Sequence, residues 1–207
     1  MRMITAIEKM DAKRYKVFLD GQPAFPLYIG ELKEYRIKEG QELEEEVYRD
    51  ILTKVLPLRA RKRCLYLLQS RAYTEKKLRE KLKEGCYPIE VIEDAISYVK
   101  SYHYIDDYAY AREYVFYHKE KEPRRKLEEK LRQRGISQGI LEEILNQAYE
   151  DWQEEEKLQY DQAKKLLKKR SYDASLADRK EQQKQYAFLM RKGFSAAVIR
   201  EVLSVEE

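Results

Sequence analysis

The sequence predicts a mainly α-helical protein, an elongated tandem array of three three-helix repeats behind a small N-terminal β-containing segment. Charged residues make up 39% of the 207, whereas only 7 residues are glycine and 5 are proline, a composition typical of long helices lined by solvent. A pattern of apolar helical runs joined by turns recurs three times after residue 57, with equivalent leucines at Leu82, Leu131 and Leu189. Runs that favour strands gather before residue 30.

Residues 1–56 are the first of four predicted segments. Asp20-Gly21 is a typical hairpin turn between two β-prone runs, and Pro26 restricts the run that contains it to an edge of the sheet. So small a sheet is marginally stable alone and is expected to pack on the helices after it. The predicted elements are strands at Ile4–Ile7, Arg14–Leu19 and Ala24–Tyr28, a short helix at Glu31–Tyr35, a turn at Glu39-Gly40 and a linking helix at Gln41–Leu56.

The repeats are predicted at residues 57–104, 105–150 and 151–207. Gly135 and Gly193 stand where a helix ends in a left-handed residue, and Cys86 takes this place in the first repeat. Ser137 and Ser195 then follow as N-caps of the next helix. The predicted helices lie near Arg59–Ser70, Thr74–Glu84, Pro88–Ser101, Asp107–His118, Pro123–Gln133, Ser137–Tyr149, Glu154–Lys169, Leu176–Arg191 and Ser195–Val205.

The stretch from Tyr104 to Val115, YIDDYAYAREYV, joins the first repeat to the second. Asp106 is predicted to cap a helix, and Asp107 in its first turn suits the positive end of the helix dipole. Paired carboxylates can also bind Mg²⁺, but no third acidic residue or phosphate-binding glycine loop accompanies them. Capping is therefore the preferred interpretation. The structural signature comprises Tyr104, Ile105, Asp106, Asp107, Tyr108, Ala111 and Val115.

The positive charge of the chain is concentrated in the first repeat. The net charge is +4, and residues 57–104 alone carry 11 basic and 6 acidic groups. Such a field attracts nucleic acid or an acidic protein surface, although a solvated helix face is the plainer alternative for any one charge run. The candidate binding residues are Arg59, Arg61, Lys62, Arg63, Arg71, Lys77 and Lys81, followed by Arg124, Arg125, Arg132 and Arg134, and by Lys168 and Arg170.

Several kinds of site find no support in the sequence. Cys64, Cys86, His103 and His118 are the only cysteines and histidines, and they lack zinc-ligand spacing. No nucleotide-binding glycine loop or catalytic motif occurs, so neither a cofactor nor an enzymatic activity is expected. No signal peptide or apolar run of membrane-spanning length is present. We therefore expect a soluble, cytoplasmic protein without a membrane partner.

These residues resemble the bacterial RecX regulatory proteins. YIDDYAYAREYV is similar to the family signature, and Leu67-Leu68-x-x-Arg71-x-Tyr73 resembles its first repeat. His103 and Cys86 replace glycines that are usual in family turns. The resemblance implies a monomeric, non-catalytic regulator of recombination, DNA repair and the SOS response. Such a protein binds the filament of the RecA recombinase, with single- or double-stranded DNA as a further partner, and mainly inhibits recombinase activity.

Two competing hypotheses remain at the level of sequence. The first is a general nucleic-acid-binding helical module that acts through the basic first repeat; its affinity for bare DNA would fall steeply with salt. The second is a protein-interaction scaffold with an unrelated partner, since helical repeats alone do not define a function.

Overall fold

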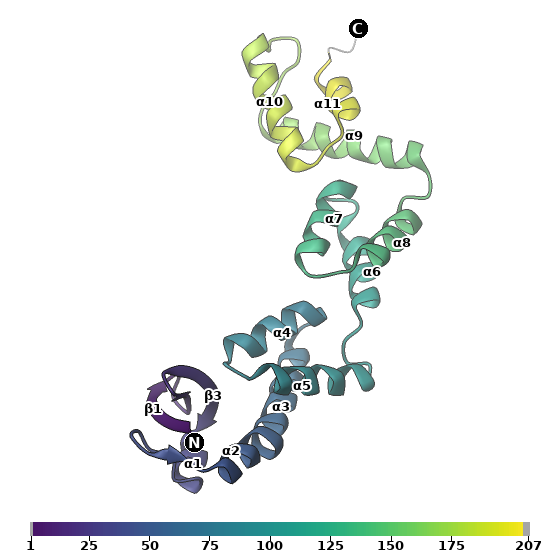
Figure 1. Cartoon of the computed structure of the whole chain (residues 1–207). Coiled ribbons are helices and arrows are strands. Elements are labelled where there is room, and N and C mark those ends of the chain that lie inside the picture. The colour runs from purple at the N-terminus through teal and green to yellow at the C-terminus, as the bar shows by residue number, and fades with distance from the viewer. Residues whose placement is uncertain (1, 205–207) are drawn as a thin grey trace. The chain divides into compact units, whose positions relative to one another are not determined.

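The computed structural model describes residues 2–204, which are mainly helical, with strands in the N-terminal segment (Figure 1). This confirms the predicted fold class of helical units behind a small β-containing segment. The chain divides into two compact units, Met1–Asp106 and Asp107–Glu207. The division falls between the two aspartates of the signature stretch.

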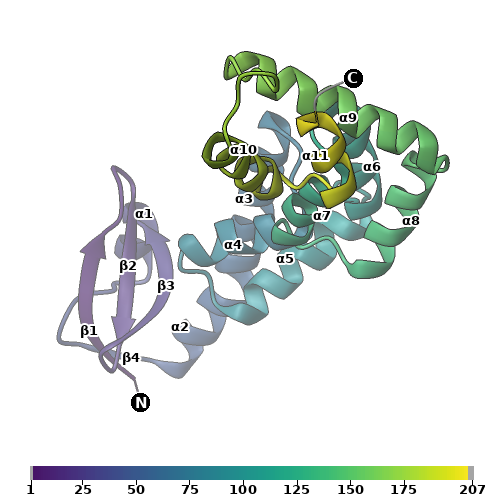
Figure 2. The same cartoon turned by 90° about the horizontal axis from the view of Figure 1, so that it is seen from above.

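The N-terminal segment contains a four-stranded antiparallel sheet in the order β3-β2-β1-β4 (Figure 2). Asp20 and Gly21 connect β2 to β3 and both have positive φ angles, 50° and 79°, as a tight hairpin turn requires. Pro26 lies in β3, at an edge of the sheet as predicted. The strands are β1 (Arg2–Lys9), β2 (Arg14–Leu19), β3 (Gln22–Tyr28) and β4 (Glu42–Leu43), and the short helix α1 spans Ile29–Glu34.

The linking helix differs from its prediction at both ends. It begins at Glu45, because Glu42–Leu43 pair with β1 instead of joining the helix. It then continues past Leu56: α2 (Glu45–Asp50), a π-helical turn (Ile51–Val55) and α3 (Leu56–Ser70) follow one another directly. Proline lacks the N–H that regular α-helical pairing uses and so disrupts a helix interior. Pro57 instead lies in the first turn of α3, next to the irregular π-helical turn.

The first unit has a single hydrophobic core. It includes Val17 and Leu27 from the sheet together with Leu56, Cys64 and Ile92 from the helices. The sheet thus packs on the following helices, as its small size led us to expect. The remaining helices of this unit are α4 (Glu75–Glu84) and α5 (Ile89–Ser101).

The second unit contains two hydrophobic cores, each formed by three helices. The predicted helices of this unit agree with the structure to within three residues. The largest difference is at the start of α10: Leu176 lies in a turn, and the helix begins at Arg179 after the capping carboxylate of Asp178. Val205, the predicted end of the last helix, lies outside the described residues. The helices are α6 (Asp107–His118), α7 (Arg124–Gln133), α8 (Gln138–Ala148), α9 (Trp152–Lys169), α10 (Arg179–Lys192) and α11 (Ala196–Leu203).

The repeated turns have the predicted backbone. Cys86, Gly135 and Gly193 all have positive φ angles, 61°, 90° and 98°, which confirms their equivalence. Ser195 caps α11 by accepting the N–H of Val198 at 3.2 Å. Ser137 occupies the N-cap position of α8, but its side chain makes no capping hydrogen bond, so that detail of the prediction is wrong.

Candidate interaction surface

Helix α3 presents the most basic surface of the first unit. Its sequence, LPLRARKRCLYLLQS, contains four cationic side chains and no carboxylate. The buried side of the helix is formed by Leu56, Ala60, Cys64 and Leu67, so helical periodicity directs the cations toward its remaining faces. We call Arg59, Arg61, Lys62 and Arg63 the basic face of α3.

Two members of this face have structural partners. Arg61 donates two hydrogen bonds to Asp94, at 2.8 and 2.7 Å, and its guanidinium lies 4.8 Å from the centre of the Tyr98 ring. The hydrogen bond to Asp94 raises the pKa of Arg61. Arg59 bonds to Glu31 at 2.7 Å and lies over Tyr28. These two cations are therefore partly neutralised.

The other two members remain available. Within residues 2–204, neither Lys62 nor Arg63 has an acidic partner. Arg63 lies 5.6 Å from the centre of the Tyr66 ring, which is 65% exposed. Leu58, one turn before Lys62, is also exposed. An exposed stripe of α3 thus combines free positive charge with apolar and aromatic surface.

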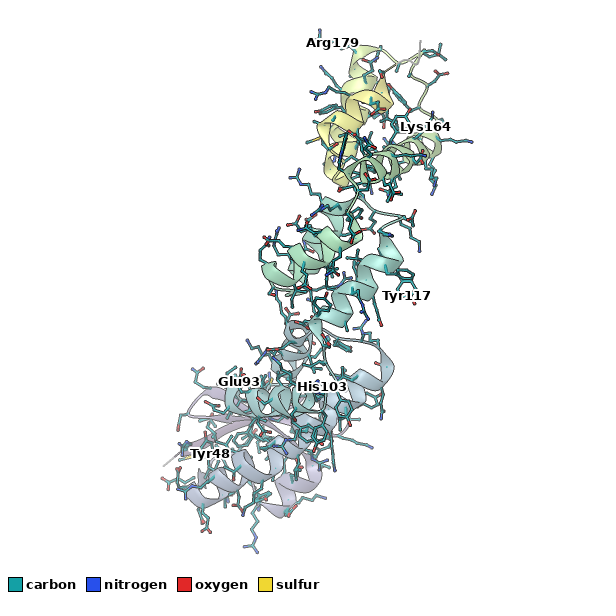
Figure 3. All side chains as sticks on the ribbon, turned by 90° about the vertical axis from the view of Figure 1, so that its right-hand side faces the viewer. Tyr48, Glu93, His103, Tyr117, Lys164 and Arg179 are labelled. Carbon is teal, nitrogen blue, oxygen red and sulfur yellow. The ribbon has the colours of Figure 1, made fainter. Side chains whose placement is uncertain are left out.

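Three basic residues of α4 have acidic partners. Lys77 pairs with Glu80 and Lys81 with Glu84, at 2.7 and 2.6 Å. Arg79 binds Glu93, which is labelled in Figure 3. The two candidate binding residues of α4, Lys77 and Lys81, are therefore partly neutralised. Arg71, just after α3, is exposed and has Tyr73 as an aromatic neighbour at 4.7 Å.

The second group of candidate cations lies on and just after α7. Arg124 donates to Asn146 at 2.6 Å and to Glu155 at 3.4 Å, whereas Arg125 is exposed and has no acidic partner in the described chain. Arg132 pairs with Glu128. A hollow of about 770 Å³ brings these three arginines together with residues of α9, α10 and the turn before α11. Arg134 lies over the ring of Tyr114 at 4.2 Å.

The third group, on and after α9, does not form one cluster of free charge. Arg170 donates to Gln185 at 2.8 Å and lies 4.3 Å from the centre of the Phe188 ring. Lys168 is exposed and has no acidic partner among residues 2–204. Arg170 therefore serves packing within the last three helices, and Lys168 is the candidate of this group that remains accessible.

The signature stretch occupies the end of the first unit and the start of the second. Ile105 is buried in the core of the first unit, whereas Ala111 and Val115 belong to the core formed with α7 and α8. Helix α6 begins at Asp107, so Asp106 directly precedes it, as an N-cap does. Among the described residues, no group of three histidine, cysteine or acidic side chains is placed to hold a metal ion.

A feature that the sequence prediction missed is a row of three neighbouring tyrosines, which we call the tyrosine ladder: Tyr98, Tyr102 and Tyr104. The ring centres of Tyr98 and Tyr102 are 4.9 Å apart with their planes tilted by 51°, and those of Tyr102 and Tyr104 are 5.8 Å apart with their planes inclined by 17°. His103, the residue between Tyr102 and Tyr104 in the sequence, has a left-handed backbone conformation and is labelled in Figure 3. The spacing of Tyr98 and Tyr102 could have indicated the first contact, because residues four apart meet on a helix.

No helix in the described part of the chain is long and apolar enough to cross a membrane.

The architecture defines a helical-repeat protein, with a basic helix, α3, in its first unit. Comparison with known proteins gives its family. Models of the first and third three-helix domains of RecX match residues 60–98 and 156–203. The chain is 34% identical over 203 residues to "Regulatory protein RecX" of Limosilactobacillus reuteri, with 96% of this chain and 74% of that protein covered. The chain belongs to the RecX family of regulatory proteins.

Other relatives match this chain over nearly its whole length. "Regulatory protein RecX" of Clostridium botulinum is 29% identical over 206 residues, which cover 98% of this chain and 95% of that protein. A solved structure, "Crystal structure of regulatory protein RecX", is similar with a TM-score of 0.62 and 31% identity, covering 98% of both chains. The N-terminal sheet segment therefore falls within the region shared with these relatives.

Proposed function

We propose that this protein modulates the RecA recombinase by binding the RecA–DNA filament and mainly inhibiting its activity in recombination, DNA repair and the SOS response. The observation that carries the proposal is the similarity to regulatory RecX proteins across 96% of the chain. In this proposal the protein acts as a cytoplasmic monomer that catalyses no reaction itself.

The mechanism we propose is docking at several points along the filament. The repeats at residues 57–104, 105–150 and 151–207 would each offer a surface to successive parts of an extended partner. Contact with the filament would oppose the addition of further subunits or alter their conformational cycle. The accessible cations Lys62 and Arg63 support a role for α3 in this contact, since they have no acidic partner within residues 2–204.

A titration of the recombinase ATPase tests the proposal. Substoichiometric amounts of this protein should suppress the ATPase of RecA on single-stranded DNA. The double variant Lys62→Glu/Arg63→Glu should suppress it less, because each reversal replaces attraction to an acidic or phosphate-bearing surface by repulsion. Lys157→Glu/Lys180→Glu is a matched control, with the same change in charge at two exposed lysines outside the candidate residues. An ATPase that is indifferent to equimolar protein would refute the proposal.

A second function, direct binding of DNA, is favoured by the absence of any carboxylate from α3. The logarithm of the protein's affinity for bare DNA should fall linearly with the logarithm of the salt concentration, because cationic side chains that bind phosphates release counterions from them. Lys62→Glu/Arg63→Glu should weaken this binding. If the variant keeps its affinity for DNA and loses inhibition of the ATPase, α3 contacts the recombinase and not the nucleic acid.

A further inference from the structure

We propose that the tyrosine ladder is a stacking platform for the bases of a single-stranded nucleic acid. The inference rests on the second function proposed above, direct binding of DNA, and deepens it by assigning a site on the first unit to the bases of a free strand.

The ladder presents aromatic surface to solvent. Tyr102 and Tyr104 are 58% and 53% exposed, although large aromatic side chains contribute most to stability when they are buried. The interplanar angle of 17° between the rings of Tyr102 and Tyr104 resembles the geometry of stacked bases. A flat, exposed aromatic surface of this kind accepts any base, because every base has a π-face.

The inner end of the ladder is fixed. Tyr98 contacts both Tyr102 and the guanidinium of Arg61, whose carbon is 4.8 Å from the centre of the Tyr98 ring. Asp94 holds this guanidinium through two hydrogen bonds. The ladder is therefore oriented before any ligand arrives, which lowers the entropic cost of binding.

The first unit also carries available positive charge. Lys62 and Arg63 lie on α3, the helix whose Arg61 contacts the ladder, and have no acidic partner among the described residues. Arg63 and the exposed Tyr66 form a second pairing of a cation with an aromatic ring. Cations that bind the backbone and aromatic rings that stack on bases are the two components of sequence-independent single-strand binding.

The fold also explains how Tyr104 reaches the stack. Helix α5 ends at Ser101, and His103 has a φ of 54°. This left-handed turn is closed by two hydrogen bonds, from the N–H of His103 to Lys100 and from that of Tyr104 to Val99, both at 2.9 Å. The chain thereby reverses and places the Tyr104 ring on that of Tyr102. A duplex keeps its bases paired inside, so this platform should select single strands.

The test compares three fluorescein-labelled probes of equal length by anisotropy: a single strand of oligothymidylate, the same strand with abasic sites throughout, and a duplex. Tyr102→Ala/Tyr104→Ala should lose about tenfold or more in affinity for oligothymidylate, since each stacked base contributes strongly to binding. It should bind the abasic strand and the duplex as the parent chain does. Its salt dependence should stay unchanged, because no phosphate contact is removed.

Two further variants serve as controls. Tyr102→Phe/Tyr104→Phe keeps both rings and should retain the affinity for oligothymidylate. Phe116→Ala/Tyr117→Ala removes an equally exposed aromatic pair from α6, 69% and 66% exposed, and should have no effect. Thermal melting of each variant checks that it is folded.

An equal loss on all three probes, an unchanged affinity for oligothymidylate, or a loss in the phenylalanine variant would overturn the inference. The inference would also be overturned if Tyr102→Ala/Tyr104→Ala lost inhibition of the recombinase but kept its affinity for the free strand. The ladder would then be a contact with protein. The outcome is separable from the proposed function, because the three probes require no recombinase.

Discussion

The Nε atom of Arg59 donates a hydrogen bond of 2.7 Å to Oε1 of Glu31, joining α3 to the first short helix of the sheet segment. The other oxygen of this carboxylate accepts the N–H of Tyr28 at 2.7 Å, and the Glu31 side chain is only 8% exposed. Both oxygens are thus occupied inside the first unit. Arg59 consequently has a structural role, although the sequence suggests it as a binding residue.

Arg59→Ala should lower the free energy of unfolding by about 1–3 kcal/mol, because a largely buried carboxylate would lose its charged partner. Lys62→Ala, which removes an exposed and unpaired cation from the same helix, should change it by less than about 0.5 kcal/mol. Urea denaturation followed by circular dichroism measures both values. Equal effects of the two substitutions would show that the pairing with Glu31 contributes nothing.

Asp106→Ala should destabilise the protein by about 0.5–2 kcal/mol, the usual cost of losing an N-cap. The residue directly precedes α6, at the division between the two compact units. We expect weaker docking of the recombinase as an indirect result. If the variant kept its full stability in urea but lost binding, Asp106 would instead contact the partner directly.

Gly193→Ala should be strongly destabilising. Gly193 has a φ of 98°, and a Cβ atom there would lie 3.3 Å from the backbone nitrogen of Lys126, so the substitution combines backbone strain with crowding. Gly139→Ala is the matched control: Gly139 lies in the first turn of α8 with open space around it, and alanine should stabilise the helix by no more than about 0.5–1 kcal/mol, the gain in a helix interior. Thermal melting should therefore shift in opposite directions for the two variants.

Stability should fall at alkaline pH. Burial raises the pKa of Cys64 to about 11 and that of Tyr87 to about 12. Burial likewise raises the pKa of Tyr149 to about 12. The folded chain therefore keeps protons that the unfolded chain releases above its ordinary thiol and phenol pKa values. Because the folded state then binds more protons, the free energy of unfolding decreases as pH rises from about 9 toward 12.

The Cys64→Ala variant isolates one contribution. At pH 8, urea denaturation should give this variant a lower free energy of unfolding than the parent chain, because a buried side chain is lost. The difference between the two values is the cost of the substitution. At pH 11 this cost should be smaller by about 1–2 kcal/mol, since the parent has by then lost the stabilisation associated with the protonated thiol. A cost that is the same at both pH values would contradict the raised pKa of Cys64.

Much of the helical fold follows from local sequence rules. The bounds of α6 agree with the prediction because the aspartate at its start and the apolar spacing of Ala111 and Val115 both act within a few residues. The apolar pattern places the start of α10 too early, although Asp178 and Glu181 carry a capping signal: the N–H of Glu181 bonds to the Asp178 carboxylate at 2.7 Å. Capping chemistry is the better guide to where this helix begins.

Other features depend on contacts that no local rule supplies. Asp94 lies 33 residues from Arg61, and their pairing decides which cations of α3 stay available. Strand β4 has two residues, too few to show the alternation that predicts a strand. The contact of Tyr104 with Tyr102 depends on the left-handed conformation of His103. The concentration of basic residues in the first repeat could therefore be predicted from sequence, but which of them stay unpaired could not.

The shared core of the first unit has a consequence for synthesis. Its buried residues extend from Ile4 to Ile105, so the sheet leaves the ribosome before the helices that cover it exist. Synthesis proceeds at about 5–20 residues per second, so several seconds pass between the emergence of the hairpins and that of α5 and Ile105. During this interval Val17, Phe25 and Leu27 lack their final cover. The nascent sheet therefore exposes apolar surface until the first unit is complete.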